Sequence, residues 1–350
     1  MNDTALSLMQ SAPGPYATID GRRYLYFVGT GYLGLQNHPE VLRAAIEALQ
    51  RYGVGSATSR AGFGTTQATL DVERRAAELY QAGDAFYFPS GYAAPSILAA
   101  ALADCCDAMF VDEWSHYCVT EAARQSGRPV FCFRHCDPDD LASSLRRNLR
   151  PGQRPLVASD GVFAARGSVA PAAEYELRLR NYAGSALVLD DAHALGVLGA
   201  NGRGTLEHAG LTASIGSDAD GDGPRLFLCG TLSKAVGGYG GIIPGPRRFI
   251  QRLKRSSHWF DGASPMPTAI AAATARALEL IAAQPALRTA LWANVELLKS
   301  GLGRLGLAVD ATPVPIVCLS LGSAAAMRRI QHDLGQRGIL LAYMPAYAGL

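Results

Sequence analysis

The sequence predicts an α/β protein with a mainly parallel sheet, followed by a smaller α+β domain. Short apolar runs alternate with segments of helical periodicity between about residue 39 and residue 245. These runs are apolar without interruption, which is typical of strands buried on both faces beneath helices. Beyond residue 245 the alternation gives way to long helical segments rich in alanine and leucine.

Two helices precede the predicted strands. The first begins at Pro39, with Asn37 or His38 near its cap, and Gly53 ends it. We expect one apolar side on this helix, formed by Val41, Leu42, Ala45, Ile46 and Leu49. A second helix covers about residues 67–81. Six predicted strands then follow along the chain: Ala85–Phe88, Ala108–Val111, Val130–Phe133, Leu156–Ser159, Ala186–Leu189 and Leu226–Cys229.

The pattern of helical and strand-like segments in the last hundred or so residues predicts the smaller domain. Helices are expected over 265–283, 286–304 and Ala325–Arg337, and strands over Ile316–Leu321 and Ile339–Tyr343. We therefore divide the chain into an N-terminal arm with the start of the first helix (1–45), a large domain (46–245) and a small C-terminal domain (246–350).

Composition and charge exclude several classes of protein. Hydrophobic residues make up 49% of the 350 residues and charged ones 18%, unlike a disordered or fibrous chain. The net charge of +2 predicts no nucleic-acid partner, and no apolar run is long enough to predict a membrane span. Residues 1–21 do not resemble a signal peptide. The seven cysteines form no repeated ligand pair, so we expect reduced thiols, no metal and a cytoplasmic location.

One acidic segment resembles part of a calcium loop. Ser217–Gly223 matches the first half of such a loop, but Cys229 stands where the loop requires a late glutamate. We therefore expect a surface loop without calcium.

Polar or titratable side chains follow five of the predicted strands. They occur in Ser90-Gly91-Tyr92, Asp112 to His116, Asp160-Gly161, Asp190 to His193 and Gly230 to Lys234. Ligands of parallel α/β folds bind at the carboxyl ends of the strands, so these side chains are expected to form one site.

Lys234 is the most informative single residue of this set. It lies after a buried strand and before Gly237-Gly-Tyr-Gly-Gly241. A lysine in such a cleft is reasonable if its amine forms a Schiff base with an aldehyde cofactor, and the glycines allow a close approach of the backbone to a bulky ligand. The alternative is a surface lysine in a flexible turn.

Asp190 favours the cofactor interpretation. A carboxylate at the end of a buried strand needs a partner, and a pyridinium nitrogen is a suitable one. His193 could donate to the phenolic oxygen of the same ring. The alternative role is a cap for the next helix, which suits Asp191 better than Asp190. Backbone N–H groups at Gly91 and Tyr92, with the hydroxyls of Thr231 and Ser233, could bind a phosphate.

The set resembles the α-oxoamine synthase family of fold-type-I pyridoxal-phosphate enzymes. The similar stretches, in the family's order, are Tyr32-Leu-Gly-Leu35, Gly55-Ser…Ser59-Arg60, Ser90-Gly-Tyr-Ala-Ala94, Ser115-His116, Gly161-Val-Phe163, Asp190-Asp-Ala-His193, Gly199…Gly202-Arg-Gly204 and Thr231…Lys234. The family includes 8-amino-7-oxononanoate synthase, 2-amino-3-ketobutyrate CoA ligase, 5-aminolevulinate synthase and serine palmitoyltransferase.

The resemblance implies a role for each matching residue. Lys234 would carry pyridoxal 5'-phosphate, Asp190 would pair with the ring nitrogen, His193 would bond the phenolic oxygen and His116 would stack on the ring. Gly91, Tyr92 and Thr231 would hold the phosphate. Ser264 would reach the phosphate of a partner subunit, which implies a homodimer with shared active sites.

The resemblance also implies a reaction. An amino acid would replace Lys234 on the cofactor, and the free lysine would remove the Cα proton. The resulting carbanion would attack an acyl thioester, from CoA or a carrier protein, and release the thiol. Decarboxylation commonly follows in the family and gives an α-amino ketone. The alternative is another reaction of the same cofactor, such as transamination or an unusual carbon–carbon condensation. A third possibility is a non-catalytic relative, which intact Lys234, Asp190 and His193 argue against.

Some positions depart from the family pattern. Ala164 stands where a serine is usual, and Arg166 introduces a positive charge nearby. Thr30-Gly31 replaces a typical Asn-Asp. The chain ends at Leu350, before the region in which the family carries the arginine for the substrate carboxylate. Either the sequence is truncated or the substrate is held differently, and in the second case Arg166 would be the substitute for that arginine.

Overall fold

The computed structural model describes residues 7–212, 215 and 223–345. Within these residues a seven-stranded sheet has the order β3-β9-β8-β7-β6-β4-β5. Its strands are β3 (Asp84–Phe88), β4 (Ala108–Asp112), β5 (Val130–Phe133), β6 (Pro155–Asp160), β7 (Ala186–Asp190), β8 (Arg225–Thr231) and β9 (Gly241–Gly245). Strands β4 to β8 are parallel to one another, and β9 runs antiparallel to both β8 and β3. The predicted mainly parallel sheet is confirmed.

Both faces of this sheet are buried, as the uninterrupted apolar runs predict. Along β3, Phe86 and Phe88 belong to one hydrophobic cluster, whereas Ala85 and Tyr87 belong to the other. The same alternation continues through β4, β6 and β7. Successive side chains of a strand point to opposite faces, so each run needs apolar residues at every position.

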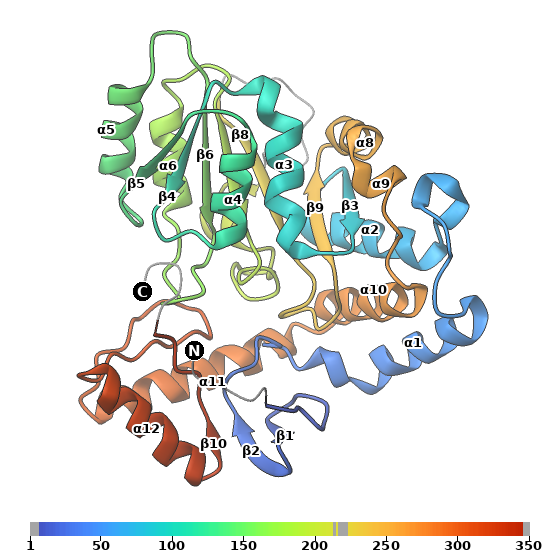
Figure 1. The fold of residues 1–350 in the computed structure, drawn as a ribbon, viewed down its shortest axis with the longest axis vertical. Coiled ribbons are helices and arrows are strands. Elements are labelled where there is room, and N and C mark those ends of the chain that lie inside the picture. The colour runs from blue at the N-terminus through green and yellow to red at the C-terminus, as the bar shows by residue number, and fades with distance from the viewer. Residues whose placement is uncertain (1–6, 213–214, 216–222, 346–350) are drawn as a thin grey trace.

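Helices cover the two faces of the sheet (Figure 1). The helices α3, α4 and α8 pack on one face, and α2, α5 and α6 pack on the other. The described helices are α1 (Pro39–Tyr52), α2 (Gln67–Tyr80), α3 (Ala94–Leu102), α4 (Tyr117–Gln125), α5 (Pro138–Asn148), α6 (Ala172–Leu179), α7 (Thr205–His208), α8 (Arg247–Ser256), α9 (His258–Asp261), α10 (Thr268–Ala283), α11 (Ala286–Arg304) and α12 (Ala324–Gln336). None of them combines the length and the apolarity that crossing a bilayer requires.

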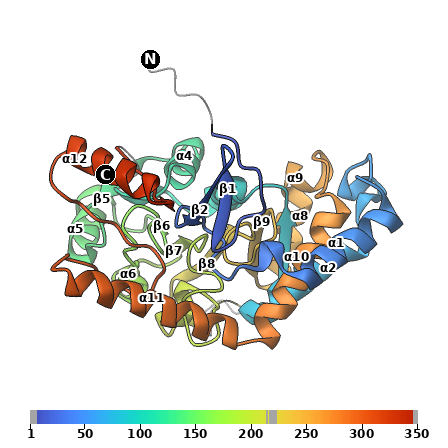
Figure 2. The same ribbon diagram turned by 90° about the horizontal axis from the view of Figure 1, so that it is seen from below.

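A second, smaller sheet joins the two ends of the chain. It consists of β1 (Tyr16–Ile19), β2 (Arg22–Tyr26) and β10 (Ile339–Leu340). The β10 strand pairs in parallel with β2, so the end of the chain is attached to its beginning. Figure 2 shows this sheet with α11 and α12 beside the large sheet. The division of the chain at residues 45 and 245 stays a prediction.

Two local predictions are wrong. The strand expected over Ile316–Leu321 is not formed, because within the described residues no neighbouring strand accepts its hydrogen bonds. The expected strand Ile339–Tyr343 is reduced to β10, where the pairing with β2 stops. The apolar side expected on α1 is covered only in part, because Val41 is buried whereas Leu42 and Ile46 are 44% and 57% exposed.

Other features of the first helices agree with the sequence. Helix α1 starts at Pro39, its cap His38 accepts a hydrogen bond from the Glu40 N–H, and Gly53 ends it with a φ of 70°. Helix α2 lies where it was predicted, and Gln81 ends it. Most of the segment Ser217–Gly223 lies outside the described residues, so the expected surface loop stays a prediction.

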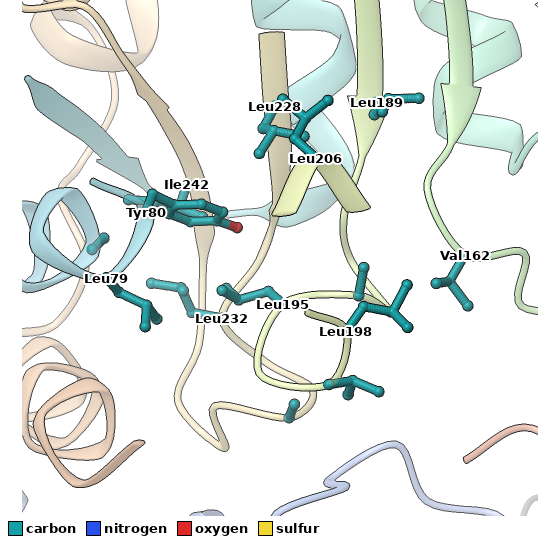
Figure 3. Packing of buried hydrophobic residues seen from close by; sticks show 14 of the residues in the cluster. Leu79, Tyr80, Val162, Leu189, Leu195, Leu198, Leu206, Leu228, Leu232 and Ile242 are labelled. Atoms are coloured by element: carbon teal, nitrogen blue, oxygen red, sulfur yellow. The ribbon is translucent and has the colours of Figure 1, made fainter. Parts of the chain in front are cut away.

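The hydrophobic core extends under the loops at the carboxyl ends of the strands. Figure 3 shows Leu195 and Leu232 among the buried residues below these strand ends, together with Tyr80 and Ile242. Leu195 and Leu232 are each at most 1% exposed. Because each lies two residues from a predicted site residue, core packing fixes the backbone that carries the site.

Candidate active site

Carboxylates and a hydroxyl meet at one edge of the large sheet. In the register of the parallel strands, Asp160 at the end of β6 lies beside Asp190 at the end of β7, which lies beside Cys229 of β8. Thr231 ends β8 two residues later. The predicted convergence of polar side chains at this edge is therefore observed for the central strands.

Lys234 and His193 are in direct contact at this edge. The Nζ atom of Lys234, in the loop between β8 and β9, lies 2.7 Å from Nε2 of His193, in the loop after β7. The other ring nitrogen of His193, Nδ1, lies 2.7 Å from the hydroxyl of Tyr32. Tyr32 lies between β2 and α1, so three distant parts of the chain meet in one hydrogen-bonded line.

Burial shifts the pKa values of Lys234 and His193 in this hydrogen-bonded line. It lowers the pKa of Lys234, and the negative charges of Asp190 and Asp160 oppose that shift. Burial and the charge of Lys234 hold the pKa of His193 well below its ordinary value, so the imidazole is neutral. A neutral amine is the form of lysine that attacks an aldehyde, so the environment of Lys234 suits a Schiff-base lysine.

Asp190 is a buried carboxylate that accepts few hydrogen bonds from its surroundings. It is 6% exposed, and its Oδ1 atom accepts a hydrogen bond from the Ala192 N–H at 2.9 Å. The Cys118 thiol donates to Oδ2 at 3.5 Å. Burial raises the pKa of Asp190, and Lys234 opposes that increase. A protonated ring nitrogen would provide this carboxylate with the strong positive partner that it lacks.

His116 lies at the start of α4, close to Asp190. Its Nδ1 atom is 2.9 Å from the Cys118 sulfur and accepts the Cys118 N–H at 3.2 Å. Its ring also meets the Tyr92 ring edge-on at 5.8 Å. Burial and the positive charge of Lys234 lower the pKa of His116, whereas Asp190 raises it. The position of His116 suits a ring that covers a flat ligand held between Lys234 and Asp190.

Two further site residues were given no role from the sequence, although Asp160 was among the side chains that follow the predicted strands. Asp160, 5% exposed, accepts the N–H of His116 at 3.2 and 3.3 Å and so fixes the start of α4. Burial and the neighbouring Asp190 raise its pKa well above the ordinary value. A signal existed for Asp160, because it ends its strand as Asp190 does. No sequence signal identified Cys118.

The residues predicted to bind the phosphate are tightly packed against one another. A Cβ atom added at Gly91 would lie 2.5 Å from Cβ of Thr231, so only glycine allows this approach. The Thr231 hydroxyl donates to the Gly240 carbonyl and accepts from the Ser233 N–H. Tyr92 is half-exposed, and its hydroxyl donates to Glu121. Gly91 opens a short 3-10 turn, and α3 begins only at Ala94.

Ser264 is exposed in the segment between α9 and α10. Among the contacts of the described residues, it makes no hydrogen bond to the other predicted site residues. Its role stays a prediction that concerns a second subunit.

A further cluster surrounds Asp112 at the end of β4. Ligand atoms of Asp112, His135 and Cys136 lie within 4.8 Å of one another. The Asp112 carboxylate already accepts hydrogen bonds from the Cys136 and Trp114 N–H groups and contacts Nδ1 of His135. These contacts explain why the carboxylate is buried, because it anchors the 134–136 turn.

The guanidinium of Arg166 lies 5.0 Å from the centroid of the Trp114 ring.

Together these residues fit pyridoxal phosphate. The amine of Lys234 has a lowered pKa, the buried carboxylate of Asp190 lacks a strong cation within salt-bridge distance among the described residues, and the Gly91 backbone lies close to the Thr231 hydroxyl because Gly91 has no Cβ atom. Aldehyde, ring nitrogen and phosphate require these three chemistries.

Comparisons with known proteins agree with a pyridoxal-phosphate site. The family model described as aminotransferase class I and II matches residues 30–345. The 8-amino-7-oxononanoate synthase of Symbiobacterium thermophilum is 33% identical over 334 residues, covering 95% of this chain and 82% of that protein. The serine palmitoyltransferase of Sphingomonas wittichii has a similar structure, with a TM-score of 0.88, 26% identity and coverage of 97% and 83%. A high-resolution structure of SPT with PLP has a TM-score of 0.87, 25% identity and coverage of 97% and 84%.

The fold and the site therefore define a pyridoxal-phosphate-dependent transferase of fold type I. More narrowly, the chain belongs to the aminotransferase class I and II family, in its α-oxoamine synthase branch.

Proposed function

We propose that this enzyme condenses an amino acid with an acyl thioester to give an α-amino ketone, with loss of the amino-acid carboxylate as carbon dioxide. The observation that carries the proposal is the contact of the Lys234 amine with His193 next to the buried Asp190. The similarity to an 8-amino-7-oxononanoate synthase and a serine palmitoyltransferase supports this reaction over others of the same cofactor.

Each residue has a defined task. Bound pyridoxal phosphate supplies an electron sink that stabilises negative charge at the amino-acid Cα. Asp190, kept ionised by the positive ring, holds the ring nitrogen in its protonated form. His193 donates from Nε2 toward the phenolic oxygen, and His116 covers the ring. Lys234 accepts the Cα proton at Nζ, and burial, which lowers its pKa, favours the neutral amine that this role requires.

Phosphate binding is assigned to Gly91, Tyr92 and Thr231. The backbone N–H groups at Gly91 and Tyr92 are the donors, and the Thr231 hydroxyl, close to Gly91 because Gly91 has no side chain, would turn from the Gly240 carbonyl to the phosphate. Arg166 is the proposed partner of the substrate carboxylate, and its stacking on Trp114, two residues before His116, supports this assignment.

Transamination is the second candidate reaction. It is favoured by Ala164, which offers no hydroxyl where the resembling family usually has serine. The two reactions differ in their products, because acyl transfer releases a free thiol and transamination consumes a keto acid.

The test uses the purified, cofactor-loaded enzyme. Each amino acid is added singly, and the visible band of the bound cofactor is recorded. Only the substrate should change the band, and subsequent addition of acyl-CoA should release one thiol per turnover, measured with a thiol reagent. If amino transfer to pyruvate occurs and no thiol is released with any acyl-CoA or acyl carrier protein, the acyl-transfer proposal is wrong.

The active form is proposed to be a homodimer with shared active sites. Leu42, Ile46 and Leu49 form an exposed apolar stripe on α1, and each is at least 44% exposed. Phe63, in the loop after α1, is completely exposed. Contiguous apolar surface of this kind is typical of an interface. In such a dimer the exposed Ser264 could reach the partner's phosphate.

Light scattering tests the dimer. The wild-type protein should have twice the mass of one chain, and Leu42→Glu with Ile46→Glu should give monomers. The control is Leu297→Glu, because Leu297 is 68% exposed on α11, away from the α1 stripe. A wild-type monomer, or a double variant that stays dimeric, would contradict the interface.

A cytoplasmic location is part of the proposal. None of the seven cysteines forms a disulfide, as expected in a reducing compartment. Cell fractionation should find the protein with the cytoplasmic markers, and a periplasmic or secreted pool would contradict this location.

A further inference from the structure

We propose that Tyr32 is a positioning residue that donates its hydroxyl hydrogen to Nδ1 of His193 and thereby fixes the hydrogen of the imidazole on Nε2. That nitrogen faces Lys234, so Tyr32 orients the donor that His193 would present to the cofactor. The inference rests on the proposed function, because it assumes that Nε2 faces the phenolic oxygen of pyridoxal phosphate.

The geometry defines a line of three groups. The Tyr32 hydroxyl lies 2.7 Å from Nδ1 of His193, and Nε2 lies 2.7 Å from Nζ of Lys234. His193 is 9% exposed, so water has little access to replace either partner. The Tyr32 and His193 rings are 6.1 Å apart and inclined by 45°.

A neutral imidazole carries one hydrogen and can donate from one nitrogen only. Burial and Lys234 hold the pKa of His193 well below its ordinary value, so the ring is neutral. Burial also raises the pKa of Tyr32, so its hydroxyl keeps its hydrogen. The tautomer is therefore decided by which neighbours must accept and which can donate.

The neighbours of the two ring nitrogens differ in whether they donate or accept a hydrogen bond. With pyridoxal phosphate bound to Lys234, the free amine would no longer be available to Nε2. The neighbour of Nε2 would instead be the phenolic oxygen, and its negative charge would make it an acceptor. If Nε2 carried no hydrogen, it and the phenolic oxygen would both be acceptors and could not form a hydrogen bond. A buried polar atom would then remain without a partner, which costs free energy. Donation by Tyr32 to Nδ1 removes this conflict.

The backbone holds Tyr32 in this place. Its neighbours Leu33 and Leu35 are buried in the core. The loop of Lys234 packs directly on the same segment, since a Cβ atom added at Gly237 would lie 2.4 Å from the Gln36 nitrogen. The Tyr32 segment and the Lys234 loop are therefore docked on each other, and Tyr32 cannot shift without moving that loop.

The experiment compares the wild-type enzyme with Tyr32→Phe. The tautomer of His193 is read from its ¹⁵N chemical shifts in the cofactor-loaded protein and without cofactor, and His193→Asn assigns the signal among the seven histidines. The wild-type holoenzyme should carry the hydrogen on Nε2. Tyr32→Phe should populate the Nδ1 hydrogen, change the pH titration of the visible band and lower kcat about tenfold, the factor expected from one lost hydrogen bond.

Tyr87→Phe is the matched control. Tyr87 is also a buried tyrosine whose burial raises its pKa, and its hydroxyl donates to the Tyr239 carbonyl at 2.9 Å rather than to a histidine. It should leave the ¹⁵N signature of His193 unchanged. Thermal unfolding checks that both variants are folded, and Tyr32→Leu replaces Tyr32→Phe if the latter is not.

The outcomes separate this inference from the proposed function. A wild-type holoenzyme with hydrogen on Nδ1 overturns the role of Tyr32, as does a Tyr32→Phe protein with unchanged ¹⁵N shifts and band titration. A protein that binds no pyridoxal phosphate overturns the proposed function instead, and the ¹⁵N shifts without cofactor still report whether Tyr32 controls the tautomer.

Discussion

Arg60 and Glu73 form a buried ion pair that should be costly to break. Two hydrogen bonds of 2.6 and 3.1 Å join the guanidinium to the carboxylate. Arg60 is 6% exposed and Glu73 is 3% exposed. Arg60 also donates to the Tyr87 carbonyl, so the pair attaches the loop after α1 to β3.

The cost of Arg60→Met follows from what remains around Glu73. Removing one partner of a buried pair costs about 3–5 kcal/mol. Here Lys254 Nζ stays 3.1 Å from the carboxylate and the Tyr87 N–H stays at 3.0 Å. These two partners lower the penalty, so we expect a loss of about 3 kcal/mol in the free energy of unfolding, at the lower end of that range.

Urea unfolding followed by circular dichroism measures this loss. The control is Arg74→Met, because Arg74 pairs with Asp71 and Glu78 on the same helix but is 51% exposed. An exposed pair contributes at most about 1 kcal/mol, so this variant should be nearly as stable as the wild type. Equal losses for the two variants would refute the reasoning that burial makes the difference.

Two further predictions concern the site. Gly91→Ala should weaken pyridoxal-phosphate binding at least about tenfold in a spectroscopic titration, because its Cβ would lie 2.5 Å from Thr231, whereas Gly303→Ala, which meets no atom within 4 Å, should bind normally. Burial raises the pKa of Asp191 to about 7, so its contribution to stability is complete below about pH 4 and is lost as the pH rises toward 7. Asp191→Asn should therefore flatten the decline in unfolding free energy between pH 4 and pH 7 measured by urea titration, and an unchanged slope would contradict the raised pKa.

The strand ends could be predicted because their chemistry is local. The run Ala186–Leu189 is apolar at every position, and two acidic residues follow at once. A buried strand that ends in a carboxylate indicates a ligand at the edge of a parallel sheet. The same logic applies to Lys234 after β8, and both residues lie where the sequence predicted.

Contacts between distant segments could not be predicted in this way. Tyr32 and His193 are 161 positions apart, and Cys118 and Asp190 are 72 apart. No periodicity in the chain relates such positions. The strand β9 was missed because Gly241–Gly245 contains two glycines and a proline, which favour a turn. It forms because it lies between β3 and β8, which both pair with it.

The exposed side of α1 shows a different limit. Its apolar periodicity correctly predicted a helix, but periodicity does not state what covers the apolar side. The structure of one chain leaves Leu42 and Ile46 open to solvent.

The most direct test of the account identifies the lysine that carries the cofactor. The sequence contains three lysines, Lys234, Lys254 and Lys299. Lys254 is paired with Glu73, and Lys299 donates to the Thr312 carbonyl. Borohydride reduction of the yellow enzyme, followed by peptide mass mapping, should place the pyridoxyl group on Lys234 alone, and Lys234→Ala should be colourless. A label on Lys254 or Lys299, or no label on a colourless wild-type protein, would contradict the central claim.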